Sequence, residues 1–225
     1  MLQVVKLGGS LLTRPSLIED LHQWRCRQRH RQTLAIVGGG RMIDAVRQWD
    51  RLRPAASPDV HWLCVDLLAG SLAHLRAALT ADDRFADTEY LSTPREWTQW
   101  RSQLGQRQDE SPGDTEANFP PKVPSPSSGQ WWWVNVPAFY HRRSPEEAAR
   151  PCPLPETWET TTDAIAWWLA DQLSADRCIL LKSCHVPHPD TPEPLIDAGI
   201  IDGGCRHLLR SPVPLVVQTL PVSDT

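Results

Sequence analysis

The chain has 225 residues, of which 40% are hydrophobic and 22% are charged, and its formal net charge is −4. This composition is ordinary for a globular protein with a sizeable core, and the length suits one domain spanning residues 1–225. The acidic balance gives no reason to expect a nucleic acid or an anionic membrane as a partner. No apolar run approaches the roughly 20 residues that a membrane-crossing helix needs, and no signal peptide is visible. We therefore expect a cytoplasmic protein.

The first predicted strand, residues 2–6, ends in the glycine turn Lys6-Leu7-Gly8-Gly9-Ser10. A helix from Pro15 should follow, because apolar residues recur there at helical spacing and proline suits a helix start. Glycine lets the backbone approach an anion, and the amide groups at a helix start point at negative charge. Lysine is poorly suited to a strand end that faces a core unless it meets an anion. This turn is therefore a candidate anion cradle.

A second glycine cluster, Gly38-Gly39-Gly40, follows the apolar strand at residues 34–37, which is typical of a strand buried between two layers of helices. In the helix predicted after it, three apolar residues fall on one face: Met42, Val46 and Trp49. Upstream, residues 25–31 alternate basic and polar side chains and predict a solvated helix end.

The remaining elements alternate between helices and strands. Further helices are predicted at residues 59–79, 96–104 and 163–173, and further strands at 87–91, 131–136, 178–181 and 215–217. This order favours an α/β fold with a mainly parallel central sheet covered on both faces.

Three segments between or within these elements have an unusual composition. Residues 106–130, rich in Pro and Ser, are predicted to be a flexible excursion, and residues 187–194 form a second proline-rich loop. Trp131-Trp132-Trp133 is interpreted as a buried strand in preference to a platform that stacks on a ligand.

A third motif, Thr160-Thr161-Thr162-Asp163, lies at a loop-to-helix junction. Asp163 could be a helix cap, which Asp and Thr favour, or an acidic residue that organises a site. Lys182 ends a strand as Lys6 does and is either a second positive charge of the site or a solvated strand end. Two anion cradles with an acidic organiser suggest a phosphoryl transferase.

Together, the Lys6–Ser10 turn, the triple glycine and Thr160-Thr161-Thr162-Asp163-Ala164 resemble the three signatures of the amino acid kinase superfamily. This superfamily includes acetylglutamate kinase, bacterial uridylate kinase, aspartokinase and isopentenyl phosphate kinase. The resemblance covers the chain from its first strand to its last, apart from residues 106–130. Within the superfamily, other features resemble the aminomethylfuran phosphate kinase of methanofuran biosynthesis: Val46-Arg47-x-x-Asp50, His61 with Asp66, and Trp158-x-x-Thr161-x-Asp163.

The resemblance implies a three-layer α/β/α sandwich in which ATP and a small phosphorylated or carboxylated acceptor lie end to end over the sheet. It implies that Lys6 bridges the donor and acceptor phosphates, that Lys182 adds a second charge, and that Asp163 orients the lysines and a magnesium ion. Gly8, Gly9 and Ser10 would bind the transferring phosphoryl group. The acceptor would be bound by Gly38, Gly39, Gly40 and His61, although His61 could equally be an ordinary position of an amphipathic helix. Superfamily members often assemble, so we expect a homo-oligomer.

One departure from the family pattern keeps other functions open. The family's Asp-Gly turn after the strand that ends near Lys182 is replaced here by Ser183-Cys184-His185-Val186-Pro187-His188. A non-catalytic binding or regulatory protein on the same fold is therefore an alternative, as is an interaction protein that uses the tryptophan-rich strand. The six cysteines should stay reduced. We predict no metal site, since the spacing of a loose set of ligand-type residues matches no standard zinc site: Cys184, His185, His188, Cys205 and His207.

Overall fold

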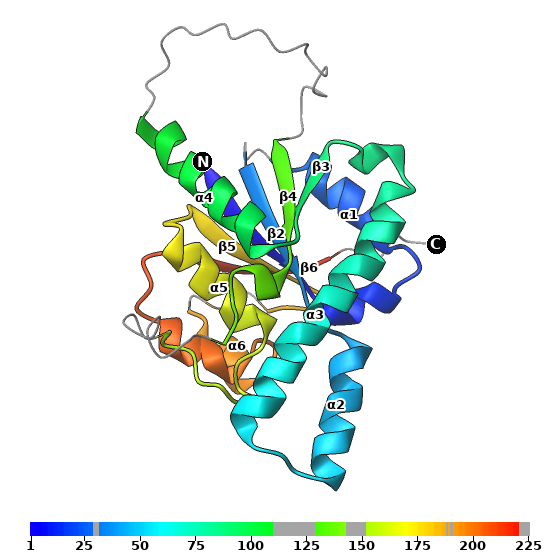
Figure 1. Ribbon diagram of the computed structural model, residues 1–225, viewed down its shortest axis with the longest axis vertical. Coiled ribbons are helices and arrows are strands. Elements are labelled where there is room, and N and C mark those ends of the chain that lie inside the picture. Colours follow the sequence, from blue (N-terminus) through cyan, green and yellow to red (C-terminus); the bar gives the residue numbers. More distant parts are fainter. Residues whose placement is uncertain (29–31, 110–128, 143–151, 188, 190, 221–225) are drawn as a thin grey trace, which may run out of the picture.

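The computed structural model describes residues 1–28, 32–109, 129–142, 152–187, 189 and 191–220. Six strands form one sheet in the order β3-β4-β2-β1-β5-β6, and every neighbouring pair is parallel (Figure 1). The strands are β1 (Leu2–Leu7), β2 (Gln32–Val37), β3 (Thr88–Leu91), β4 (Gln130–Val134), β5 (Arg177–Lys182) and β6 (Leu215–Thr219). The predicted α/β fold with a mainly parallel sheet is confirmed.

Helices connect these strands. They are α1 (Leu17–Cys26), α2 (Arg41–Leu52), α3 (Ser57–Thr80), α4 (Pro94–Asp109), α5 (Thr162–Gln172) and α6 (Glu193–Asp197). Short 3-10 helices at Gly9–Thr13 and Gly203–Leu208 were not predicted, nor was α6, which begins within the proline-rich loop predicted at 187–194. Of the excursion predicted at 106–130, residues 110–128 lie outside the described residues, while 106–109 belong to α4 and 130 to β4.

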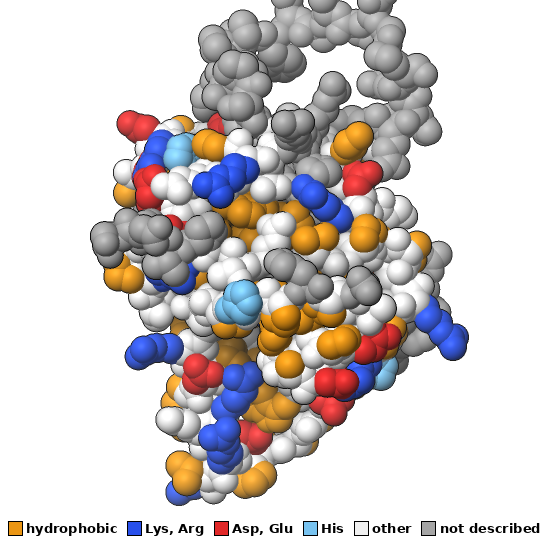
Figure 2. All heavy atoms as spheres, turned by 180° about the vertical axis from the view of Figure 1, so that it is seen from behind, with side chains coloured by type: hydrophobic (Ala, Val, Ile, Leu, Met, Phe, Trp, Pro, Cys, Tyr) orange, Lys and Arg blue, Asp and Glu red, His pale blue; other side chains and the backbone are white. Residues whose placement is uncertain are grey.

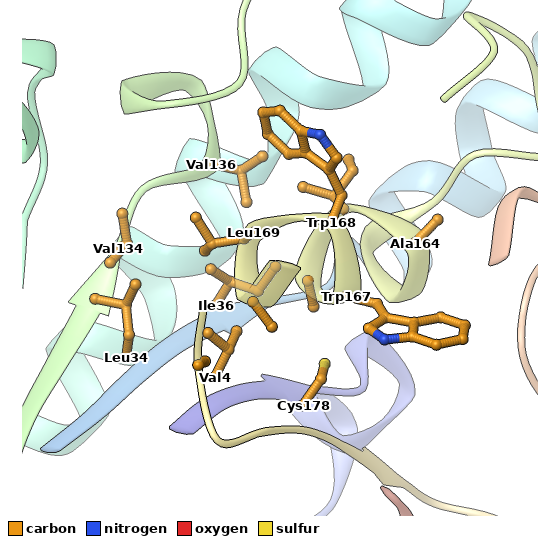
Figure 3. Close-up of a cluster of buried hydrophobic side chains, with 14 of the residues drawn as sticks. Val4, Leu34, Ile36, Val134, Val136, Ala164, Trp167, Trp168, Leu169 and Cys178 are labelled. Atoms are coloured by element: carbon orange, nitrogen blue, oxygen red, sulfur yellow. The ribbon is translucent and has the colours of Figure 1, made fainter. Parts of the chain in front are cut away.

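Two hydrophobic clusters lie on opposite faces of the sheet, because successive side chains of a strand point to opposite faces. On one face, α5 packs over Val4 of β1 and Cys178 of β5 (Figure 3). On the other face, α1 packs against Val5 and Leu7 of β1. The same alternation places Lys6 on the α5 face with Val4, and Lys182 on that face with Cys178. The sheet therefore directs both strand-end lysines toward α5.

The tryptophan run is a buried strand, as predicted. The exposed fractions of Trp131, Trp132 and Trp133 are 3%, 4% and 0%. Trp131 and Trp133 belong to the cluster on the α1 face, whereas Trp132 faces α4, where its ring lies 5.6 Å from that of Trp100. These rings contribute buried area on both sides of the sheet.

The prediction that residues 25–31 form a solvated helix end is wrong for Arg25. This side chain is 4% exposed, and its Nη2 atom lies 2.5 Å from Oδ2 of Asp87. Its guanidinium carbon also lies 5.4 Å from the centre of the Trp131 ring. A planar guanidinium can be buried where a carboxylate and the faces of aromatic rings take the place of its hydrating water. Asp87 and Trp131 have this role for Arg25.

The predicted apolar face of α2 is only partly buried. Val46 is buried, but Met42 and Trp49 are 39% and 66% exposed. The physical reason is the position of α2, which packs against α3 and projects beyond the sheet (Figure 1). At this end of the molecule, hydrophobic and positively charged side chains lie next to one another on the surface (Figure 2).

We expected no segment that is long and apolar enough to cross a membrane, but helix α3 is one. By length and composition alone, its 24 residues pass as a membrane-crossing helix. In the fold, its apolar side contributes Val65 and Leu68 to one core cluster and Leu72, Leu75 and Leu79 to the other. The apolar side chains of α3 thus pack into both core clusters.

We predict that Trp133→Ala destabilises the protein by about 3–5 kcal/mol, because it empties a fully buried site between α1 and the sheet. Trp49→Ala is the matched control and should change the free energy of unfolding by about 0.5 kcal/mol or less, since Trp49 is mostly exposed. Urea unfolding followed by circular dichroism measures both. Equal losses for the two variants would contradict this account of the core.

Candidate active site

The centre of the candidate site is a buried carboxylate held between two lysines. Asp163, in the first turn of α5, is 3% exposed. Its Oδ1 accepts a hydrogen bond from Lys6 Nζ at 2.8 Å, and its Oδ2 accepts one from Lys182 Nζ at 2.5 Å. Lys6 is the penultimate residue of the central strand β1, and Lys182 ends the adjacent strand β5. Two positive charges and one negative charge therefore meet at the carboxyl edge of the sheet, where parallel α/β sheets bind ligands.

Burial and charge act against each other at this cluster. Burial opposes ionisation of Asp163, but Lys6 and Lys182 outweigh it and hold the pKa of the carboxyl below its usual range. Burial is also the main cause that lowers the pKa of the Lys182 amine, followed by the like charge of Lys6, while Asp163 counteracts both. The ionised carboxylate thus keeps two ammonium groups close together in a poorly hydrated place.

The two glycine turns pack directly on each other beside this cluster. A Cβ atom on Gly9 would lie 2.1 Å from the backbone nitrogen of Gly40, and one on Gly38 would lie 2.8 Å from the nitrogen of Gly9. Gly40 also has a φ of 54°, a conformation that other residues rarely adopt. Only glycine allows the ends of β1 and β2 to come this close.

A cavity of about 430 Å³ opens next to the glycines. Its polar end is lined by Lys6, Gly9, Ser10 and the three glycines 38–40, together with the three threonines 160–162. Its other walls come from α2, α3, α5 and the loop before α5, and they include Ile43, Asp44, Arg47, His61, Cys64, Val65, Leu68, Trp158 and Ile165. The cavity thus joins a cationic, hydroxyl-rich end to a partly apolar body.

The predicted site residues divide into those that line this cavity and those that lie behind them. Lys6, Gly9, Ser10, Gly38–Gly40 and His61 line it, whereas Gly8, Asp163 and Lys182 are not among its walls. The Gly8 amide donates to the Leu181 carbonyl at 2.9 Å, and the Gly38 amide donates to the Leu7 carbonyl at 2.9 Å. These two amides fasten the turns to the neighbouring strands, so they are not directed at a ligand.

His61 is buried and its ring is engaged on two sides. Its Nε2 atom lies 3.1 Å from the Tyr140 hydroxyl, and the ring also hydrogen-bonds to the backbone of Thr157. Burial lowers the pKa of this imidazole. A neutral ring with these partners suits a positioning role in the cavity wall better than the binding of a phosphate.

Asp202, which directly precedes the 3-10 helix Gly203–Leu208, has a structural role at the start of α5. Its Oδ2 atom accepts hydrogen bonds from the Thr161 hydroxyl at 2.5 Å and from the amides of Thr161 and Ala164 at 3.2 Å each. A carboxylate 38 to 41 residues away in sequence therefore caps α5, since the N-cap side chain of Thr161 does not do so. Burial is the main cause that raises the pKa of Asp202, with the nearby charge of Asp163 adding to it.

Residues of α2 contact Trp158 in the wall of the cavity. The Trp158 indole Nε1 donates to Oδ2 of Asp50 at 2.8 Å, and the guanidinium carbon of Arg47 lies 5.3 Å from the centre of the Trp158 ring. Arg47 also pairs with Asp44 at 2.9 Å. The sequence motifs Val46-Arg47-x-x-Asp50 and Trp158-x-x-Thr161 are thus joined in space and connect α2 to the loop before α5.

The loose metal-ligand set does not come together in the part of the chain that the structure describes. Cys205 is buried beside Asp202, while Cys184, His185 and His207 are exposed; His188 is outside the described residues. Among the described residues, no three His, Cys, Asp or Glu side chains are grouped so that they could hold a metal ion.

No protein-family model matches this sequence, and no curated protein matches it either. Solved structures do match. An aspartate kinase from Synechocystis superposes with a TM-score of 0.60 at 15% identity, over 100% of this chain and 39% of its own, so this chain spans about two fifths of that protein. UMP kinases from Bacillus anthracis and Ureaplasma parvum give TM-scores of 0.58 and 0.56, each at 11% identity, over 99% and 97% of this chain and 88% and 89% of theirs. The chain has the amino acid kinase fold.

We predict that Asp163→Asn costs about 3–5 kcal/mol of stability at pH 7, because it leaves two buried ammonium groups without a counter-charge. The pKa of Asp163 is depressed in the folded state, so its stabilisation is complete above the ordinary value of 3.8 and is lost as the pH falls through the folded value. The gap in unfolding free energy between wild type and variant, measured in urea, should therefore narrow only below about pH 4. The exposed Asp197→Asn is the control, and a gap that stays constant down to pH 2 would contradict the assignment.

Proposed function

We propose that this protein catalyses ATP-dependent phosphoryl transfer to a small phosphorylated or carboxylated metabolite. The observation that carries the proposal is the contact of Lys6 and Lys182 with the same buried carboxylate, beside a cavity floored by glycine backbone. Catalysis of phosphoryl transfer depends mainly on positioning and on stabilising the charge that spreads over the transferring group. Two buried ammonium groups that share one carboxylate supply positive charge for that stabilisation.

The choice of residue type supports a specific role for these charges. The chain has only three lysines among its 23 basic residues, at positions 6, 122 and 182, and two of them meet at Asp163. An ammonium group is a compact point charge that can contact oxygens of two ligands from one position. We assign charge stabilisation to Lys6 and Lys182, and orientation of both amines to Asp163.

The described residues fit the phosphates of a nucleotide better than they fit a metal ion. Lys6, the amide-rich Gly9–Ser10 turn and the strand-end Lys182 would hold the phosphate chain, at the start of a 3-10 helix. Both oxygens of Asp163 already accept from lysines, and the described residues hold no acidic cluster for Mg²⁺. A magnesium ion would therefore be bound mainly by the donor phosphates.

The acceptor would occupy the 430 Å³ cavity with its anionic group toward the glycines. Thr160 lines this end, but its hydroxyl oxygen is buried beside Gly204 and has no hydrogen-bond partner among the described residues. Arg47 and Trp158 also line this cavity. Because their motif resembles that of the aminomethylfuran phosphate kinases, an aminomethylfuran phosphate is our specific proposal for the acceptor.

A second candidate function is ligand binding without transfer. It is favoured by the turn after β5, where Ser183–His188 replaces the family's Asp-Gly turn. The two candidates differ in product: a binding protein would take up the phosphorylated ligands but form no ADP with any acceptor.

We expect Lys6→Ala to lower transfer from MgATP by about 10²–10³-fold, the usual effect of removing one donor to a developing charge. Folding should survive, because Asp163 keeps Lys182 as a neutralising partner. The measurement is ADP release with a panel of small phosphorylated and carboxylated acceptors that includes an aminomethylfuran phosphate. The exposed Arg206→Ala is the control for loss of a positive charge and should keep full activity. Wild-type protein that neither binds MgATP at millimolar concentration nor releases ADP would refute the proposal.

Trp158→Phe tests the acceptor side separately. The substitution keeps an aromatic ring for Arg47 but removes the indole donor to Asp50, so α2 loses its tie to the loop before α5. We expect the KM for the acceptor to rise about 10-fold, as for the loss of one hydrogen bond to a charged group, while the KM for MgATP stays constant. An equal rise in both constants would show that the tie supports the whole site rather than the acceptor cavity.

A further inference from the structure

We propose that Asp202 is a positioning residue for the phosphoryl transfer, which holds Asp163 between the two lysines although it does not line the cavity. The inference rests on the proposed function and adds to the site a residue that lies outside the cavity wall. Asp202 directly precedes the 3-10 helix Gly203–Leu208, and it is not among the residues that line the 430 Å³ cavity. Its effect on a bound ligand must therefore pass through the residues that it contacts.

The hydrogen bonds of Asp202 enclose Asp163 in the sequence. Its Oδ2 atom accepts from the hydroxyl and the amide of Thr161, which is the N-cap of α5, and from the amide of Ala164, directly after Asp163. Amides at a helix start have no partner within the helix, and the Thr161 side chain does not supply one. Asp202 therefore fixes the main chain on both sides of the residue that contacts the lysines.

The lysines themselves are contacted by Asp163 and not by Asp202. In the described part of the chain, the hydrogen bonds of Lys6 Nζ and Lys182 Nζ both go to Asp163. The other oxygen of Asp202, Oδ1, accepts from the Cys205 thiol at 3.7 Å. Each hydrogen bond of Asp202 among the described residues is thus one that it accepts. The site uses Asp202 as an acceptor that orders α5, and Asp163 as the partner of the amines.

The segment that carries Asp202 is itself fixed against the loop before α5. The Gly204 amide donates to the Glu159 carbonyl at 2.6 Å. A Cβ atom on Gly204 would lie 2.9 Å from that carbonyl oxygen and 3.0 Å from the Cα atom of Thr160, so the two main chains are in direct contact. Cys205 is fully buried in the core cluster that also contains α5. Asp202 therefore holds the helix start from a rigid support.

This support matters for transfer because the amines act on charge that develops during the reaction. Lys6 and Lys182 can stabilise that charge only while Asp163 holds both of them at the edge of the sheet. A looser first turn of α5 would leave the glycine turns in place but would displace the amines from the transferring group. The loss should therefore appear in kcat more than in the KM for MgATP.

The test compares Asp202→Ala with Asp202→Asn in the steady-state release of ADP. Both variants lack the charge, but only Asp202→Asn keeps an oxygen that can accept from Thr161 and Ala164. We expect Asp202→Ala to lower kcat about 10-fold, which corresponds to about 1.4 kcal/mol and lies within the range for a lost helix cap. Its KM for MgATP and the kcat of Asp202→Asn should both stay within about 3-fold of wild type. Equal impairment of the two variants, or a wild-type kcat in Asp202→Ala, would overturn the inference.

A control and a milder variant accompany this comparison. Asp197→Ala removes an exposed carboxylate that pairs with Arg206, and it should leave both constants unchanged. Asp202→Ser replaces Asp202→Ala if the latter does not fold, because its shorter side chain reaches fewer of the three donors. It should lower kcat about 3-fold, and an unchanged kcat would overturn the inference.

A second measurement does not depend on turnover. The Asp202→Ala and Asp202→Asn substitutions are repeated in an Asp163→Asn background, and the equilibrium constants of unfolding are measured in urea. The ratio between the two Asp202 variants should be at least about 3-fold larger when Asp163 is present, since residues that act through each other couple, whereas independent sites add to within about 2-fold. Equal ratios in the two backgrounds would overturn the inference. Wild-type protein that releases no ADP would refute the proposed function, and the comparison of ratios would still decide whether Asp202 holds Asp163.

Discussion

Asp163 is the residue on which the arrangement of the site depends, because its ionised carboxylate allows two lysine amines to be buried next to each other. Buried ion pairs are poor sources of stability, since desolvation cancels most of the attraction. Here one carboxylate contacts both ammonium groups, while the nearby Asp202 is bonded to the start of α5. Hydrophobic side chains at this position would have cost less free energy. The two amines instead favour the approach of an anion to this edge of the sheet, next to the glycine turns.

The geometry of parallel strands makes this cluster possible. In β1 and β5 the residues that share a face alternate with those of the opposite core, so Val4 is followed by Lys6, and Leu180 by Lys182. Lys6 is in register with Leu180, which puts the two lysines on neighbouring strands about one side-chain repeat apart. Helix α5 packs on this face, and its first turn, capped by Asp202, delivers Asp163 between the amines. The core that fixes α5 over the sheet is therefore also what fixes the charges.

Much of this could be predicted from the sequence, because the relevant signals are local. The alternation of strand, glycine turn and helix has short-range physical causes, and it correctly indicated the α/β fold. The proximity of Lys6 and Asp163, which the structure shows, was implied by the resemblance of these motifs to a known family. What the sequence could not give depends on distant partners. The burial of Arg25 requires Asp87 and Trp131, and the exposure of Trp49 follows from where α2 lies relative to the sheet. A hydrophobic pattern states which residues can be buried, but not whether a surface exists to bury them.

Side chains surround the lysine cluster on the side of the cavity, whereas hydrogen-bonded main-chain groups lie on the side of β6. This difference affects specificity. Toward the cavity, walls from α2, α3 and α5 present a mixture of side chains, among them the linked Arg47 and Trp158. Toward β6, main-chain groups of the Lys182–Val186 segment are bonded to Thr219 and Leu220. Side chains can be exchanged one at a time to fit a new ligand, whereas a main chain bonded to its neighbours cannot be altered without moving the strand. The side chains that line the cavity are therefore the part of the site at which single substitutions can most readily change the choice of acceptor.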